Sequence, residues 1–114
     1  LVLGLFFGSR VGEVERHGAT LRAVAQKIAH DYPGIHFVVP TLSHIESMVR
    51  EYLRDIPDVH FTVDNPDKPV LFASMTAAVA VSGTVALELS VANIPHVIGY
   101  RVKPLTFHIL KHLI

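Results

Sequence analysis

Residues 1–14 read LVLGLFFGSRVGEV, and this segment indicates the fold class of the chain. Residues 1–7 are continuously apolar instead of alternating with polar side chains, which is typical of a parallel strand covered on both faces. The Gly-Ser-Arg turn that follows opens a segment with helical character. A buried strand that passes through a short glycine turn into a helix is the repeating unit of an open α/β sheet.

The same alternation continues to the end of the chain. Further strands are predicted at 35–40, 59–63, 77–81 and 96–100. Helices are predicted between and after them, namely one that stops at Pro33-Gly34, one after Ser43, one around 69–75, one at about 85–92 and one from Pro104. Right-handed crossovers between such units give a Rossmann-like open parallel sheet with helices on both faces.

Two of these helices carry clear patterns. In the second, Ser43 and Glu46 have the spacing of a capping box, in which the serine side chain and the glutamate satisfy the first backbone N–H groups. The first helix places its apolar side chains on one stripe that faces the expected core: Leu21, Val24, Ala25, Ile28 and Tyr32.

Length, charge and cysteine content exclude several kinds of function for this chain. A chain of 114 residues forms one domain with a sizeable core, and half of its residues are hydrophobic, with a mean hydropathy of +0.41. Ten Lys and Arg balance ten Asp and Glu, and the pI is about 7.3, which gives no charge-based case for a nucleic-acid partner. The absence of cysteine excludes disulfides and thiolate metal sites.

The ends of the sequence indicate a piece of a longer protein. The chain starts without Met inside an expected strand and stops within the apolar helical pattern HILKHLI. No signal peptide is recognisable, and the longest apolar run is far short of the roughly 18 residues that a membrane span needs.

The first candidate site is the turn after the first strand. Gly8 allows close approach of a ligand to the backbone, the following helix offers unpaired N–H groups, and Arg10 adds a forked cation. These features suit a phosphate or diphosphate. The alternative is an ordinary Gly-Ser turn in which Arg10 pairs with Glu13 on the surface.

The second candidate, SGTVALE, follows the predicted strand at 77–81. Ser82, Gly83 and Thr84 form a polar helix start rich in N–H groups, and Glu88 shares a helix face with Thr84. Glu88 has no capping-box partner, and its carboxylate suits two neighbouring hydroxyls such as those of a ribose. The alternative is a solvent-facing Glu88 without a role.

Other polar residues carry weaker patterns. His108 and His112 are four residues apart, but without a third ligand they favour a solvated or interfacial helix face over zinc. Asp55/Asp58 and Asp64/Asp67 lie in turns, where aspartate is common. The tail at 101–114 is equally typical of a membrane-surface segment and of a packing helix.

Three segments resemble lipid-A-disaccharide synthase. GSRVGEV is similar to that family's P-G-S-R-x-x-E-[IV] loop, YPGIHFVVP to its Y-P-x-L-x-F-V-V-P, and SGTVALELSVANIPHVIGYRVKPLTF to its S-G-T-A-x-L-E … P-M-V-x-x-Y-R-x-x-P-x-T segment. The resemblance spans the whole chain in order. Two positions depart from it: Phe7 replaces the usual Pro, and DNPDKP at 64–69 replaces a D-G turn.

The resemblance implies one half of a GT-B fold, the half that binds the UDP-sugar donor. In this family the full enzyme transfers diacylglucosamine from UDP to diacylglucosamine 1-phosphate and inverts the anomeric centre. Carried over by position, the donor site would consist of Gly8, Ser9 and Arg10 in the cleft, Glu13 orienting their loop, Ser82, Gly83 and Thr84 at the diphosphate, Glu88 at the ribose, and Tyr100 and Arg101 in the cleft wall.

The resemblance also implies partners and a location. The general base would belong to an N-terminal domain of the same protein, so the piece alone would be inactive, and no metal or cofactor is expected because the protein supplies the charge. The enzyme would be cytoplasmic and peripheral at the inner membrane, and it could form an oligomer.

Three competing hypotheses remain at the level of sequence: a UDP-N-acetylglucosamine epimerase, the peptidoglycan glycosyltransferase, and a non-catalytic, flavodoxin-like α/β module. The Gly-Ser-Arg turn and the Y-R-x-x-P-L-T segment disfavour both enzymes.

Overall fold

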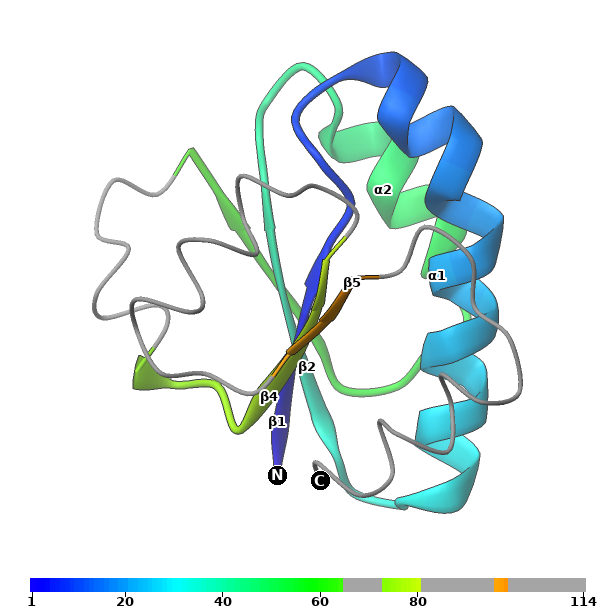
Figure 1. The fold of residues 1–114 in the computed structure, drawn as a ribbon, viewed down its shortest axis with the longest axis vertical. Coiled ribbons are helices and arrows are strands. Elements are labelled where there is room, and N and C mark those ends of the chain that lie inside the picture. The colour runs from blue at the N-terminus through cyan, green and yellow to red at the C-terminus, as the bar shows by residue number, and fades with distance from the viewer. Residues whose placement is uncertain (65–72, 81–95, 99–114) are drawn as a thin grey trace.

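A computed structural model describes residues 1–64, 73–80 and 96–98. Its strands and helices follow the predicted alternation (Figure 1). In chain order they are β1 (Val2–Phe6), α1 (Val11–Asp31), β2 (His36–Thr41), α2 (Glu46–Tyr52), β3 (Val59–Val63), β4 (Ala77–Ala80) and β5 (His96–Ile98). The five predicted strands are therefore confirmed to within a residue or two wherever the structure describes them.

The strands form one parallel sheet in the order β3-β2-β1-β4-β5. The chain builds outward from β1 through β2 to β3, and then continues on the other side of β1 with β4 and β5. Leu3 of β1 pairs with Ala77, and Phe6 pairs with Ala80, so β1 and β4 end side by side. This order confirms a Rossmann-like α/β fold, and the reversal between β1 and β4 is where such sheets bind ligands.

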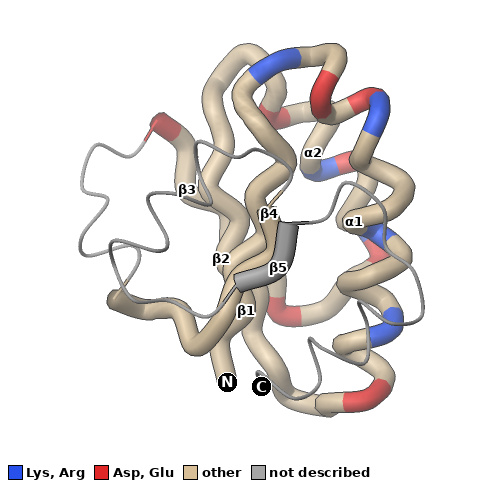
Figure 2. Tube along the Cα trace, viewed as in Figure 1, with Lys and Arg blue, Asp and Glu red and all other residues tan. Residues whose placement is uncertain are grey.

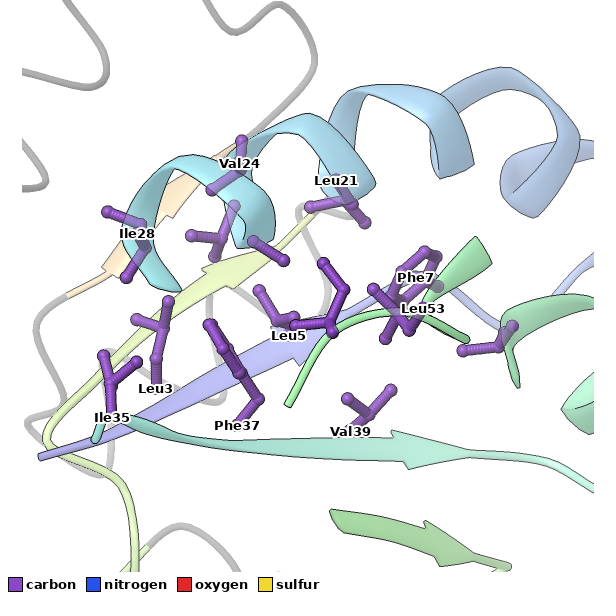
Figure 3. Close-up of a cluster of buried hydrophobic side chains, with 14 of the residues drawn as sticks. Leu3, Leu5, Phe7, Leu21, Val24, Ile28, Ile35, Phe37, Val39 and Leu53 are labelled. Atoms are coloured by element: carbon purple, nitrogen blue, oxygen red, sulfur yellow. The ribbon is translucent and has the colours of Figure 1, made fainter. Parts of the chain in front are cut away.

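Both described helices lie on one face of the sheet (Figure 1). Between them and the sheet lies the larger apolar cluster, to which alternate residues of the strands contribute, among them Leu3, Leu5, Phe37 and Val39 (Figure 3). The opposite face carries a second, smaller cluster with Phe6, Met75, Ala78 and Ala80. β1 is thus buried on both faces, as its continuously apolar sequence predicts.

The sequences of the five strands contain no Lys, Arg, Asp or Glu. In the part of the chain coloured in Figure 2, these residues lie on the helices and their connections. The predicted apolar stripe of α1 is confirmed for Leu21, Val24, Ala25 and Ile28, which are all buried. Tyr32, its fifth predicted member, follows the helix as the C-cap residue and packs partly buried on the core. Phe7, which stands where the resembling family has Pro, is also buried and stacks on Tyr52 of α2 with ring centroids 6.4 Å apart. No described helix is long and apolar enough to cross a membrane.

The predicted capping box at the start of α2 is wrong. The helix begins at Glu46 with Ile45 as its N-cap residue, and no side chain caps it. A capping box needs the glutamate to reach the N–H of the serine, but the Ser43 N–H donates to the Asp64 carboxylate at 3.1 Å. Glu46 instead accepts from Arg50, with 2.6 Å between Oε2 and Nε.

The helices predicted at about 85–92 and from Pro104 lie outside the described residues, as do residues 69–72 of the helix predicted around 69–75. His108, His112, Asp67 and the tail at 101–114 lie outside them as well.

Candidate functional site

The turn after β1 has a backbone that requires glycine. Gly8 has φ +96°, in the left-handed region that L side chains rarely adopt. A Cβ added there would lie 3.0 Å from both Cβ and Cδ of Glu13. The chain therefore makes a close turn against the first turn of α1.

Glu13 holds this turn. Its half-buried side chain accepts a hydrogen bond from the Ser9 N–H, with 3.3 Å between N and Oε1. This is the contact that an orienting role for Glu13 would need. The surface ion pair between Arg10 and Glu13 that the alternative interpretation expects is not formed, because Glu13 binds the Ser9 backbone.

Arg10 is exposed at the N-cap position of α1, where its backbone is extended (φ −122°, ψ 146°). No ion pair restrains its guanidinium within the part of the chain that the structure describes. Beside it, the first backbone N–H groups of α1 have no partner inside the helix. A free cation next to unpaired N–H groups at a helix N-terminus is suited to bind an anion.

The connection that follows β2 also reaches this turn, and the residue after β3 in turn binds that connection. His44 donates from Nε2 to the Ser9 carbonyl oxygen at 2.9 Å, and the neighbouring Ser43 N–H is bound by Asp64, the residue after β3. Sequence reasoning missed both contacts, since His44 was one of eight scattered histidines and Asp64 resembled a routine turn residue. The available indication was position, because both follow strands at the ligand edge of the sheet.

The strand that precedes the second predicted loop ends beside β1. Ala80 is the partner of Phe6 in the sheet, and Ser82 comes two residues after Ala80 in the sequence. The predicted site residues beyond that point lie outside the described residues: Ser82, Gly83, Thr84, Glu88, Tyr100 and Arg101. Of the predicted donor site, the structure thus brings together Gly8, Ser9, Arg10 and Glu13 at the end of β1.

The described part of the site offers one cation, backbone N–H groups and hydroxyl or imidazole side chains on exposed loops. Such groups recognise an anionic ligand by hydrogen bonds and charge. Among the described residues no three His, Asp or Glu side chains lie close enough together to hold a metal ion. Arg10 and the first N–H groups of α1 are the described groups of this edge that suit an anionic ligand.

Comparison with known proteins identifies relatives. The family model described as lipid-A-disaccharide synthetase matches residues 1–114. Lipid-A-disaccharide synthases from Rhodospirillum centenum and Erwinia tasmaniensis are 39% and 37% identical over 99% and 100% of this chain. The chain spans only 28% and 30% of the length of those two proteins.

A solved structure shares the fold. UDP-GlcNAc 2-epimerase from Neisseria meningitidis, bound to UDP-GlcNAc, matches 85% of this chain and 27% of its own with a TM-score of 0.67. The sequence identity is 18%, so this likeness shows the fold alone. Because the family model covers every residue, and relatives align along nearly the entire chain, the protein belongs to the lipid-A-disaccharide synthetase family.

Proposed function

We propose that this chain binds the UDP-sugar donor of a glycosyltransferase, a UDP-activated diacylglucosamine. The whole protein would transfer the sugar to diacylglucosamine 1-phosphate, giving the lipid A disaccharide and UDP. One observation carries the proposal: β1 and β4 pair up to Phe6 and Ala80, so the strands that precede the Gly-Ser-Arg turn and the Ser-Gly-Thr segment in the sequence end side by side. Membership of the family supports the choice of reaction.

The chemistry follows from the leaving group. As the bond to the sugar breaks, negative charge develops on the departing diphosphate. Cationic and N–H groups that face that charge stabilise the transition state more than the ground state. Since Glu13 occupies the Ser9 N–H, the phosphate oxygens would meet the Arg10 guanidinium and the first free N–H groups of α1.

The remaining residues complete the donor site in this proposal. Ser82, Gly83 and Thr84 would bind the diphosphate from the β4 side, Glu88 the ribose hydroxyls, and Tyr100 and Arg101 the cleft wall. Because these groups supply the charge, the reaction would need no metal or other cofactor. The general base would come from an N-terminal domain, and the enzyme would act at the cytoplasmic surface of the inner membrane.

A titration of the 114-residue chain with UDP, UMP and AMP, followed by NMR shifts, tests the nucleotide class. We expect selective responses to UDP at Ser9, Arg10, Thr84 and Glu88. Arg10→Gln should weaken UDP binding about tenfold or more, because hydrogen bonds to charged groups contribute roughly 1.5–3 kcal/mol. Its effect on UMP should be smaller, since UMP lacks the second phosphate.

Arg16→Gln is the matched control. Arg16 is also exposed on α1, and its loss changes the net charge by the same amount. UDP affinity should therefore stay within about twofold of the wild type, as expected for a screened surface charge. Equal responses to UDP and AMP, or no response to either, would instead favour the non-catalytic module.

A second experiment addresses the ribose. In the intact protein, Glu88→Gln should raise the donor KM and lower kcat/KM by roughly 10- to 150-fold, because the charge-assisted bond is lost. Wild-type kinetics in this variant would refute the assignment of Glu88.

A further inference from the structure

The Ser9–Arg10 turn is held from a second side by His44. The imidazole Nε2 lies 2.9 Å from the Ser9 carbonyl oxygen, across 35 residues of sequence. A carbonyl oxygen can only accept, so Nε2 must carry a proton, and the bond forms with either the Nε2–H tautomer or the imidazolium. The donor residue therefore belongs to the connection between β2 and α2, not to the turn itself.

The two residues next to His44 in the sequence are both held in place by contacts. On one side, the Ser43 N–H donates to the Asp64 carboxylate at 3.1 Å, while the Asp64 N–H donates to the Thr41 carbonyl at 3.0 Å. On the other side, Ile45 is completely buried in the core. The backbone of His44 is therefore fixed by its two neighbours, although its side chain lies at the surface.

Both polar backbone groups of Ser9 are consequently bound by side chains: its N–H by Glu13 and its carbonyl by His44. The two bonds approach from different elements, α1 and the β2–α2 connection. Together with the left-handed Gly8 they leave the peptide between Ser9 and Arg10 little rotational freedom. The guanidinium of Arg10, in contrast, has no ion pair within the described residues.

We propose that His44 is a positioning residue for anion binding: by holding the Ser9 carbonyl, it keeps Arg10 and the first N–H groups of α1 aimed at the diphosphate. This inference rests on the proposed function. His44 does not touch the ligand in this proposal. Its contribution is preorganisation, since a turn that is already held in place loses less conformational entropy when the ligand binds.

The test compares three variants of the 114-residue chain with the wild type. His44→Phe removes the donor, and His44→Gln keeps a side-chain N–H that can reach the carbonyl. His30→Phe is the matched control, because its side chain is 85% exposed in the last turn of α1, at the opposite edge of the sheet. Affinity for UDP is measured together with the carbonyl carbon shift of Ser9 and the amide shift of Arg10.

In His44→Phe we expect UDP affinity to fall about fivefold, the size of one net hydrogen bond, with clear shifts at Ser9 and Arg10. His44→Gln should bind within about twofold of the wild type, and His30→Phe should match it. The thermal transition of His44→Phe should fall by no more than about 4–8 °C, the shift that the loss of one net hydrogen bond causes in a small domain, so every variant remains folded at 25 °C. Wild-type affinity in His44→Phe, or an equal loss in His44→Gln, would overturn the inference.

The NMR shifts separate this inference from the proposed function. If the wild type does not respond to UDP, the proposed function fails. The Ser9 and Arg10 shifts of the ligand-free variants then show whether His44 holds the turn. A change at Ser9 and Arg10 in His44→Phe that His44→Gln reverses would support the positioning contact. Unchanged shifts in His44→Phe would overturn it.

Discussion

At the scale of single residues, Gly8 has the strictest requirement. Replacing it by alanine forces φ +96° on an L residue and brings the new Cβ to 3.0 Å from Glu13. We expect Gly8→Ala to lower the free energy of unfolding by about 1–2 kcal/mol, the usual cost of such a backbone conformation. Urea denaturation followed by circular dichroism measures this.

Gly12 provides the comparison within the same segment. It lies in the first turn of α1, and a Cβ added there would meet nothing within 4 Å. Alanine is the better helix former by up to about 1 kcal/mol, so Gly12→Ala should leave stability unchanged or raise it. Equal losses in the two variants would show that the positive φ of Gly8 is not the cause.

Residues close in sequence could be predicted at this scale, and distant ones could not. Gly8 and Arg10 could be singled out as candidates because they directly follow the first predicted strand and match the Gly-Ser-Arg loop of the resembling family. The bond from His44 to Ser9 depends on how two connections 35 residues apart fold toward each other. No local preference encodes that contact.

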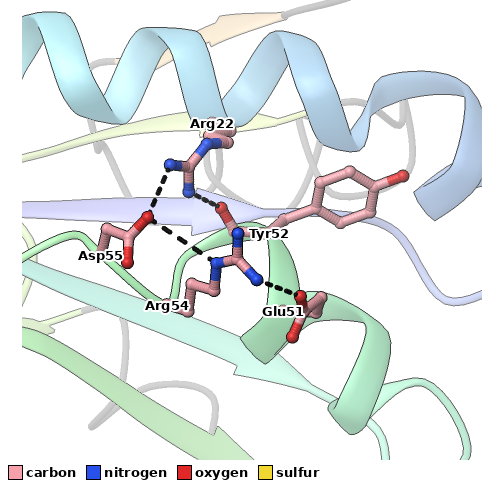
Figure 4. A network of polar contacts seen from close by, with 5 residues as sticks. All are labelled: Arg22, Glu51, Tyr52, Arg54 and Asp55. Carbon is pink, nitrogen blue, oxygen red and sulfur yellow. Dashed lines mark hydrogen bonds and ion pairs between the residues drawn. The ribbon is translucent and has the colours of Figure 1, made fainter.

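At the scale of elements, Arg22 holds α1 against the end of α2. Its Nη1 donates to the Tyr52 carbonyl at 2.5 Å, and its Nη2 lies 3.2 Å from the Asp55 carboxylate (Figure 4). Arg22→Met keeps the apolar stem but loses both contacts and leaves a part-buried helix-end carbonyl unpaired. We expect a loss of about 1–2 kcal/mol in the free energy of unfolding, measured by urea denaturation.

Arg54→Met is the matched control in the same network. Arg54 pairs with Glu51 and Asp55, but its side chain is 64% exposed and that of Glu51 70% (Figure 4). Exposed pairs contribute little, so the expected loss is below about 0.5 kcal/mol. If Arg54→Met lowered the free energy of unfolding as much as Arg22→Met, it would contradict the conclusion that Arg22 holds α1 against the end of α2.

The elements themselves were largely predictable, because burial on both faces gives strands such as β1 and β4 an unbroken apolar sequence. The error lies at the start of α2. The Ser43–Glu46 spacing is correct for a capping box, but the Asp64 carboxylate competes for the same Ser43 N–H. A contact between distant segments thus overrides a local pattern, which is the usual reason why helix ends are harder to predict than helix interiors.

At the scale of the whole molecule, the order of the strands places the end of β4 beside the end of β1. The alternation of strands and helices predicts a parallel sheet, but it does not say that β4 lies next to β1. That adjacency comes from long-range pairing, Leu3 with Ala77 through Phe6 with Ala80. Because all strands are parallel, the last residues of β1, β2 and β4 lie at one edge of the sheet.

This arrangement makes a directional prediction for ligand binding. UDP should slow amide hydrogen exchange at the edge where the strands end, in residues 8–13 and 82–88. It should leave the opposite edge unchanged, at 33–36 and 57–59. At a UDP concentration ten times the Kd, any opening that is incompatible with binding is suppressed about tenfold, so exchange should slow by that factor. Mass spectrometry of peptides from the two edges measures the hydrogen exchange at each edge in one experiment.

Arg10→Gln, examined at the same UDP concentration, links this protection to the diphosphate. Since the variant binds UDP more weakly, the slowing at 8–13 should largely disappear while exchange without ligand stays as in the wild type. Protection at the edge with residues 33–36 and 57–59 would contradict the proposed site, because Arg10 and the turn after β1 lie at the other end of the strands. Protection confined to 82–88 would instead assign the nucleotide to the β4 side alone and exclude a role for Arg10.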